Sequence, residues 1–163
     1  MATKEEITAG IRDVEARLER LLPAIVTNLD QPLPEGSWTV HDALCHMAAD
    51  AHSVPRWQRM VNDTISGVSS RPPGWRLDDY NQQGIDERKG KPLDEVVQEI
   101  RDGLHSDTEI VAGLEDSLLT REVKNFRGEM QPASERLKFT TGGHNHMHLD
   151  DIENAISLAT ERS

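Results

Sequence analysis

The sequence is short of cysteine, aromatic residues and positive charge. Its single cysteine, Cys45, excludes an internal disulfide framework and is compatible with a reducing cytoplasm. Two Phe, one Tyr and three Trp provide few of the side chains that favour β-strands. With 18 Lys and Arg against 29 Asp and Glu, the formal net charge is −11. Since binding to phosphate groups requires clustered Lys and Arg, we expect no nucleic-acid partner and no attachment to an anionic membrane surface.

Long apolar runs are also absent. No run approaches the roughly 18 residues that cross a membrane. Residues 1–6 lead directly into a charged helical pattern, without the apolar region of a signal peptide. We therefore expect a cytoplasmic protein. A chain of 163 residues is long enough to bury one full hydrophobic core, and residues 1–163 are expected to form a single domain.

What the sequence does contain is apolar residues at spacings of three and four, which is the period of an amphipathic helix. The pattern predicts long helical segments over 4–29, 39–65, 92–118 and 132–159, with a shorter helix over 78–89. Residues 121–131 lack a clear period and are expected to form a loop or a short extended excursion. With no convincing strands, the chain is predicted to be all-α, a four-helix bundle with a short extra helix in the long connection.

Several residues indicate where these helices begin and end. The hydroxyl of Thr39 can cap the second segment, and Asp42 three residues later gives a variant of the capping box. Pro55 lies inside that segment and should kink it or end its first half. Gly90 and Pro92 separate the short helix from the third long one.

Three histidines carry most of the functional information. His144 and His148 are four residues apart on a predicted helix, so both rings leave the same face beside the core stripe. His46 lies near the inward edge of the second segment. An unpaired buried imidazole is costly, and one shared metal ion would satisfy all three rings. A solvated histidine cluster is the ordinary alternative. Imidazole ligands suit Zn, Ni, Cu or Fe.

The residues around His46 offer supporting roles. Asp42 and Asp50 stand four residues before and after it, and either carboxylate could accept the second imidazole N–H and fix the tautomer. Both could equally be exposed acids on the helix surface. Cys45 is rotated about 100° from His46 on the helix and is expected to be a buried thiol rather than a ligand or a nucleophile.

The residues Gly36 to His46 read Gly-Ser-Trp-Thr-Val-His-Asp-Ala-Leu-Cys-His. They resemble the Gly-Trp-(Ser/Thr)-Val-x-(Asp/Glu)-x-Leu-x-His opening of the second helix in the DinB-like superfamily, which includes YfiT-type proteins and mycothiol-dependent maleylpyruvate isomerases. Residues 143–152 look like the His-x-x-x-His segment of that superfamily's last helix, and residues 80–96 are similar to the stretch leading into its third helix. The resemblance implies a DinB-type four-helix bundle that binds a divalent metal, Zn or Ni, through His46, His144 and His148.

The sequence also departs from this pattern. The isomerase branch commonly has Glu where this chain has His144, so an all-histidine triad is closer to the DinB and YfiT branch. Leu149, Asp150 and Asp151 replace the basic or Gln residue that usually follows the last ligand. A substrate preference is therefore not carried over from the resemblance.

The first functional hypothesis is a metal-dependent S-transferase or isomerase acting on small electrophiles. The metal would bind a low-molecular-weight thiol of the mycothiol or bacillithiol type and lower its pKa, so that the thiolate attacks. In a loop before and at the start of the short helix, Trp75 could supply an apolar wall and Arg76 could clamp an anionic group, with Tyr80 and Asn81 also lining the pocket. These four residues could equally lie on the surface.

Two other hypotheses remain open. A metal-dependent hydrolase would activate water, with Asp50 moving the proton. Asn145 stands where zinc proteases carry Glu after the first histidine, so small amides or esters are expected rather than peptides. The third hypothesis is a metal-binding or ligand-binding protein without catalysis. A requirement for added thiol distinguishes the first from the second. The aliphatic helix faces could also support a homodimer, although no feature demands one.

Overall fold

The computed structural model describes residues 1–125 and 127–161. Its long helical segments are α1 (Lys4–Ile25), α2 (Val40–Asp50) followed by α3 (Ser53–Ser66), α5 (Leu93–Gly113), and α7 (Ala133–Lys138) followed by a π-helical turn η1 (Phe139–Gly143) and α8 (His144–Glu161). The short helices are α4 (Leu77–Asp86) and α6 (Asp116–Leu119), and β1 (Glu122–Lys124) pairs with β2 (Met130–Pro132). The predicted four-helix bundle with a short extra helix in the long connection is confirmed.

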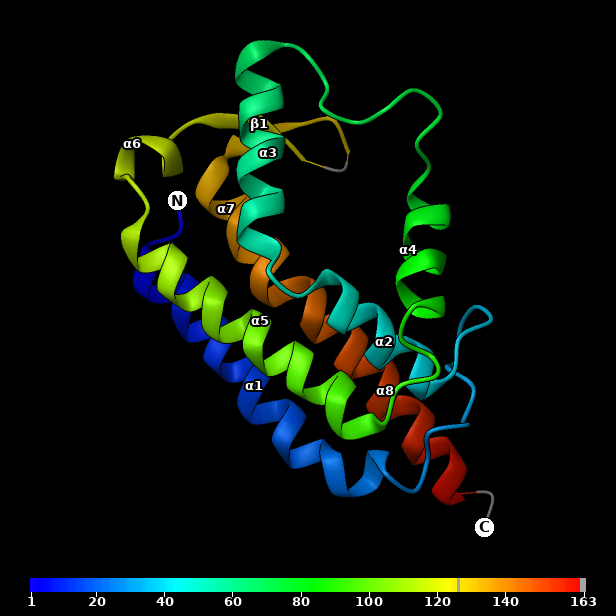
Figure 1. The fold of residues 1–163 in the computed structure, drawn as a ribbon. Helices are drawn as coiled ribbons and strands as arrows, with labels where there is room; N and C mark the ends of the chain where they lie inside the picture. The colour runs from blue at the N-terminus through cyan, green and yellow to red at the C-terminus, as the bar shows by residue number, and fades with distance from the viewer. Residues whose placement is uncertain (126, 162–163) are drawn as a thin grey trace.

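The four segments run in two directions (Figure 1). The chain descends the bundle in α1 and again in α7–α8, and it runs the opposite way in α2–α3 and in α5. Helix α1 contacts α5 and α8, and α2 contacts the same two helices. The second and third long segments are thus parallel although they follow one another, which requires the long connection over residues 67–92. Helix α4 in that connection packs on α2.

The core lies between these four segments and is almost entirely aliphatic. The largest fully buried side chains include Ile7, Ile11, Leu18, Ile25, Leu44, Met47, Trp57, Ile100, Leu137, Leu149 and Ile152. Trp57 is the one aromatic side chain in this set, and its indole N–H donates to the carbonyl oxygen of Ala133 at 2.9 Å. Among the described residues, no helix is both long and apolar enough to cross a membrane.

The predicted cap of α2 is present. The Thr39 hydroxyl accepts from the backbone N–H of Asp42 at 3.2 Å, and the Asp42 carboxylate accepts from the backbone N–H of Thr39 at 2.9 Å. These two bonds satisfy N–H groups that have no partner within the helix. The cap fixes where α2 begins, and therefore which of its residues face the core.

Other boundaries differ from the prediction. Helix α1 ends at Ile25, before Leu29, where the side-chain amide of Asn28 donates to the carbonyl oxygen of Ala24 at 2.8 Å. Helix α5 ends at Gly113 because Leu114 is extended, so the apolar repeat continues into the separate helix α6. In the described part of residues 121–131, strand β1 pairs with the first residues of β2, so the expected extended excursion is confirmed.

The break between α2 and α3 comes earlier than Pro55. Helix α2 ends at Asp50, and His52 takes the left-handed conformation with φ of 59°. Pro55 is the third residue of α3, where a backbone N–H would have no helical acceptor. The first two N–H groups of α3, from Ser53 and Val54, donate instead to the carboxylate of Asp107 at 2.8 and 3.0 Å. Helix α5 therefore caps α3 through a side chain distant in sequence.

Gly103 allows α5 to approach this break. A Cβ atom at Gly103 would lie 2.3 Å from the Cβ of Ala51 and 2.8 Å from the backbone nitrogen of His52. Real Cβ atoms do not approach other atoms so closely, so any side chain here would push α5 away from the α2–α3 junction.

We predict opposite effects for two Gly→Ala substitutions. Gly103→Ala should lower the free energy of unfolding by about 1–3 kcal/mol, because the added methyl overpacks the junction. Gly10→Ala should raise it by up to about 1 kcal/mol, because Gly10 lies inside α1 and nothing is within 4 Å of its added Cβ. Urea unfolding of both variants measures the difference. Equal stability of the two variants would contradict the close approach of α5.

Candidate metal centre

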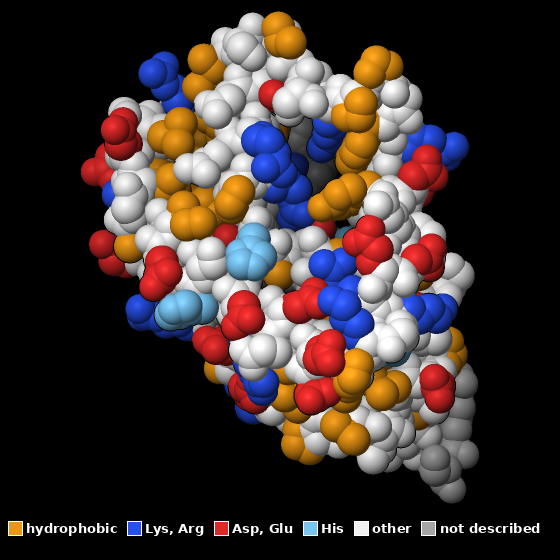
Figure 2. Space-filling model, viewed as in Figure 1, with side chains coloured by type: hydrophobic (Ala, Val, Ile, Leu, Met, Phe, Trp, Pro, Cys, Tyr) orange, Lys and Arg blue, Asp and Glu red, His pale blue; other side chains and the backbone are white. Residues whose placement is uncertain are grey.

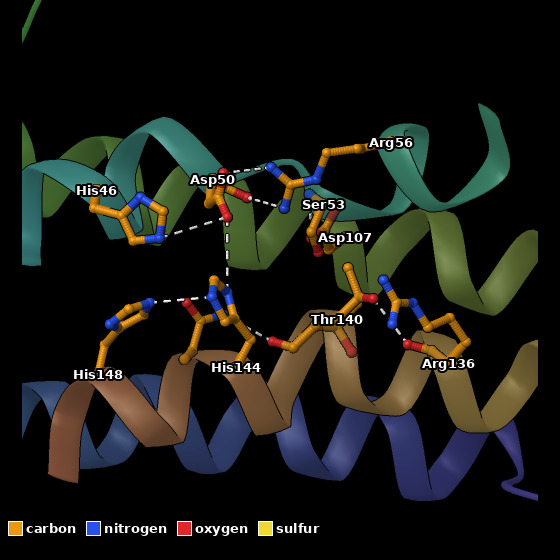
Figure 3. Close-up of polar contacts among 11 residues, drawn as sticks. His46, Asp50, Ser53, Arg56, Asp107, Arg136, Thr140, His144 and His148 are labelled. Atoms are coloured by element: carbon orange, nitrogen blue, oxygen red, sulfur yellow. Dashed lines mark hydrogen bonds and ion pairs between the residues drawn. The ribbon is translucent and has the colours of Figure 1, made fainter. Parts of the chain in front are cut away.

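The structure brings His46, His144 and His148 together. One ring nitrogen from each lies within 4.8 Å of the other two. The ring centroids are 4.7 Å apart for His46 and His148, 4.5 Å for His144 and His148, and 5.5 Å for His46 and His144. His46 comes from α2 and the other two from the first two turns of α8, so the rings face each other across the bundle (Figure 3).

The π-helical turn η1 sets the position of α8. The backbone N–H of His144 donates to the carbonyl oxygen of Phe139, five residues earlier. Such a wide turn changes the register of the residues that follow it relative to those before it. Gly142 in this turn lies against α1, where an added Cβ would be 3.6 Å from the carbonyl carbon of Gly10. The turn therefore directs His144 and His148 toward α2.

The distance between the two α8 rings suits a shared ion. The Nε2 atoms of His144 and His148 are 3.1 Å apart. Two nitrogens bound to one tetrahedral zinc ion at about 2.0–2.1 Å are separated by about 3.3 Å. The Nε2 atom of His46, which lies near Asp50, is on the side of the ring that faces His144 and His148 (Figure 3). The donor set and its geometry fit a divalent ion with at least one position open.

Burial keeps these rings neutral. It lowers the pKa of His46 to about 4, against the opposing effect of the Asp50 carboxylate. It lowers the pKa of His148 to about 3, and the neighbouring His144 and His46 rings add to the shift. The pKa of His144 is also lowered, chiefly by burial. Metal ligation needs deprotonated imidazole, so all three rings have free lone pairs at neutral pH.

Asp50 lies beside two of the three rings. Its Oδ2 atom is 3.8 Å from Nε2 of His46 and 3.7 Å from Nδ1 of His144, which is longer than a hydrogen bond. Its Oδ1 atom accepts from Nη1 of Arg56, and Nη2 of Arg56 is 3.4 Å from its backbone oxygen. The Asp50 side chain is only 11% exposed. Arg56 thus holds a buried carboxylate at the edge of the histidine cluster.

Asp42 does not take the orienting role that the sequence allowed. Its carboxylate is engaged in the cap with Thr39 and lies 3.5 Å from Nζ of Lys89. Within the described residues, no hydrogen-bond partner is present for the buried Nδ1 of His46. The orientation of Asp42 is therefore fixed by its hydrogen bond in the helix cap, and not by a hydrogen bond to the His46 imidazole.

The four pocket residues predicted from the sequence divide into two groups. Tyr80 lies near Arg56, because it helps to raise the pKa of that guanidinium. The ring of Trp75 lies 6.0 Å from that of Tyr80. Arg76 is exposed and Asn81 is partly buried, and neither makes a hydrogen bond to a site residue within the described parts of the chain.

Trp38 and Arg56 are site residues that the sequence reasoning missed. The ring of Trp38 lies 4.9 Å from that of His46 and 6.2 Å from that of His148, so it covers one side of the cluster. The sequence could have pointed to Trp38, because this residue lies one position before the cap in the segment that resembles the DinB-like motif. No sequence feature pointed to Arg56, because its position beside Asp50 depends on the break between α2 and α3.

The remaining cysteine and histidines lie outside the cluster. Cys45 is fully buried, as expected, and burial raises the pKa of its thiol to about 11. The other histidines contact residues elsewhere: His41 lies 3.8 Å from Sγ of Cys45, His105 lies 3.4 Å from Glu109, and His146 lies 3.3 Å from Asp13. His52 occupies the helix break.

No family model and no curated protein matches this sequence. Solved structures do. YfiT from Bacillus subtilis, described as a probable metal-dependent hydrolase with an unusual four-helix bundle topology, aligns over 96% of this chain and 87% of its own with a TM-score of 0.73 and 18% identity. An uncharacterized protein from Clostridium difficile 630 aligns over 94% of this chain and 95% of its own, with a TM-score of 0.66 and 14% identity.

A mutant of the mycothiol-dependent maleylpyruvate isomerase is also similar. It aligns over 93% of this chain and 61% of its own, with a TM-score of 0.64 and 15% identity. At such low identities the likeness shows the fold. The chain has the fold of YfiT and of this isomerase, so the four-helix bundle that the sequence resemblance implied is confirmed as a fold.

The neutral histidines predict acid sensitivity of the metal-free protein. Its free energy of unfolding should fall by a few kcal/mol between about pH 6.5 and 4, because the unfolded chain protonates these rings near 6.5 whereas folded His46 and His148 titrate only near 4 and 3. Well above pH 6.5, these rings are neutral in both the folded and the unfolded chain, so they add no pH dependence to the stability.

Urea unfolding at a series of pH values measures this loss. His148→Gln should flatten the dependence, because it removes one buried titratable ring. His105→Gln is the matched control and should leave the dependence unchanged, because the side chain of His105 is 77% exposed. Identical pH profiles for the two variants would contradict burial of a neutral His148.

Proposed function

We propose that the protein is a divalent-metal-dependent enzyme acting on small molecules, with His46, His144 and His148 as the ligands of a Zn or Ni ion. The observation that carries the proposal is the convergence of three neutral rings from α2 and α8 within 4.8 Å. Three histidines leave an open coordination position, which is typical of catalytic rather than structural sites. The fold shared with YfiT, itself described as a probable metal-dependent hydrolase, supports the same reading.

The reaction that we favour is S-transfer or isomerisation with a low-molecular-weight thiol. A metal ion bound at the three histidines would lower the pKa of a thiol so that the thiolate forms at neutral pH. The chain's own thiol is unsuitable, because Cys45 is buried with its pKa raised to about 11. The thiol is therefore a co-substrate of the mycothiol or bacillithiol type. The mycothiol-dependent isomerase with the same fold supports this choice.

Asp50 is the residue placed to carry a proton. Its carboxylate lies 3.8 Å from His46 and 3.7 Å from His144, so a substrate group held near the histidines would be within its reach. Arg56 keeps the carboxylate in place through its hydrogen bond to Oδ1 of Asp50. The ring of Trp38 excludes water from one side of His46. In the forward step Asp50 would accept the thiol proton and later return it to the leaving group.

Hydrolysis of small amides or esters is the second candidate. The description of YfiT favours it, and the same constellation would serve it, with Asp50 accepting a proton from water instead of from a thiol. The two candidates share their ligands and differ in the nucleophile. Only the co-substrate requirement separates them.

Metal content tests the ligand assignment. We expect one divalent ion per chain in protein purified without an affinity tag, and at most about a tenth of that in His144→Ala or His148→Ala, because two nitrogens hold an ion far more weakly than three. Elemental analysis measures this content. His105→Ala is the matched control and should keep the parent's metal content, because its side chain is 77% exposed and pairs with Glu109.

Equal metal content in His144→Ala and His105→Ala would contradict the site. Circular dichroism of each variant shows that the helical fold is retained before metal contents are compared.

Thiol dependence tests the reaction. With a panel of small electrophiles, we expect the metal-loaded protein to turn over only when mycothiol or bacillithiol is added. Asp50→Asn should lower kcat roughly 10²–10⁴-fold, the usual range for loss of a general acid–base. Asp94→Asn, at an exposed position on α5, is the matched control and should leave kcat unchanged. Turnover of amides or esters without thiol would favour the hydrolase instead.

A further inference from the structure

Three arginines gather next to the histidine cluster. Arg56 comes from α3, Arg71 from the connection that follows it, and Arg136 from α7. Burial and the positive charges of Arg56 and Arg71 lower the pKa of Arg136 to about 10. In a chain with a formal net charge of −11, such a concentration of positive charge is unexpected from composition.

The arginines lie close to the candidate ligands. The charges of Arg56 and of Arg136 both contribute to lowering the pKa of His144. Figure 3 shows Arg56 on α3 and Arg136 on α7 on opposite sides of a gap. The histidine cluster lies farther along, where α2 and α8 face each other. The surface is hollowed between α3 and the segment that leads into α4, and basic side chains line the hollow (Figure 2). The hollow gives a small molecule access to these charges.

Two of the three arginines are held in place by contacts of their own. Asp50 pairs with Arg56, and the buried Asp107 is engaged by the first residues of α3. Arg71 lies with its guanidinium carbon 3.9 Å from the centre of the Trp75 ring, an interaction that positions the group without neutralising it. The two charges that most affect Arg136 are both positive.

We propose that Arg136, Arg71 and Arg56 form a binding site for an oxyanion of the substrate, a carboxylate or a phosphate, and so select anionic small molecules. This inference rests on the proposed function, because it places the anionic group beside the metal centre. Guanidinium groups bind such oxyanions through paired, charge-assisted hydrogen bonds, and partial burial strengthens them. The sequence pointed to Arg76 as the anion clamp. The structure assigns that role to these three arginines, while Arg76 itself is exposed.

The test measures anion binding to metal-free protein, so that an anion cannot bind through the metal. Inorganic phosphate and malonate are titrated separately by calorimetry at constant ionic strength. We expect both the parent and Arg12→Gln to bind at least one of them. Arg136→Gln and Arg71→Gln should weaken that binding roughly 10–100-fold, the effect of losing a hydrogen bond to a charged group. Arg12 is the matched control because it is exposed on α1, a helix that contributes none of the three arginines.

The two substitutions keep the test decisive. Arg136 is partly buried, and its replacement could affect folding, whereas Arg71 is exposed and its replacement should not. Absence of phosphate and malonate binding in the parent, or equal affinity in Arg71→Gln and Arg12→Gln, would overturn the proposal. Preference for phosphate over malonate, or the reverse, identifies the oxyanion. Metal content of Arg71→Gln should equal that of the parent, so failure of the anion site is distinguishable from failure of the metal site.

Discussion

The burial of three imidazole rings against one another is the constraint on which the rest of this structure depends. One nitrogen of each ring faces the other two, and in a neutral ring that nitrogen is either an N–H donor or a lone-pair acceptor, so the three facing nitrogens cannot all be paired with one another. The bundle holds them there with a capped α2 on one side and a π-helical turn before α8 on the other. An ion with three nitrogen ligands removes the conflict, and the proposed chemistry follows from its open position.

Local signals in the sequence predicted the parts of the site that lie within one helix. The spacing of His144 and His148 places them on one face, and Thr39 with Asp42 fixes the start of α2 and hence the orientation of His46. The DinB-like motif linked the two helices. Parts that depend on contacts between distant segments could not be predicted. The break at His52 relies on Asp107 of α5 and on the close approach of Gly103, and that break is what places Arg56 beside Asp50.

Overall charge and local charge give different information about this molecule. The net charge of −11 describes its surface and led us to expect no nucleic-acid partner. The site is described instead by a few residues, namely Arg56 with the Asp50 carboxylate that pairs with it, and Arg71 and Arg136. Beside neutral histidines, this arrangement forms the sites that we propose for an ion and for an anionic substrate. The overall composition averages over the surface and the site, so it predicts neither of these two proposed sites.

The most direct test of the account is a crystal structure of the zinc- or nickel-loaded protein with diffraction data collected on both sides of the metal's absorption edge. The account predicts one strong anomalous peak per chain, about 2.0–2.1 Å from one nitrogen of each of His46, His144 and His148. A peak bound elsewhere, or a fully loaded protein in which the ring of His46 points away from the ion, would contradict it.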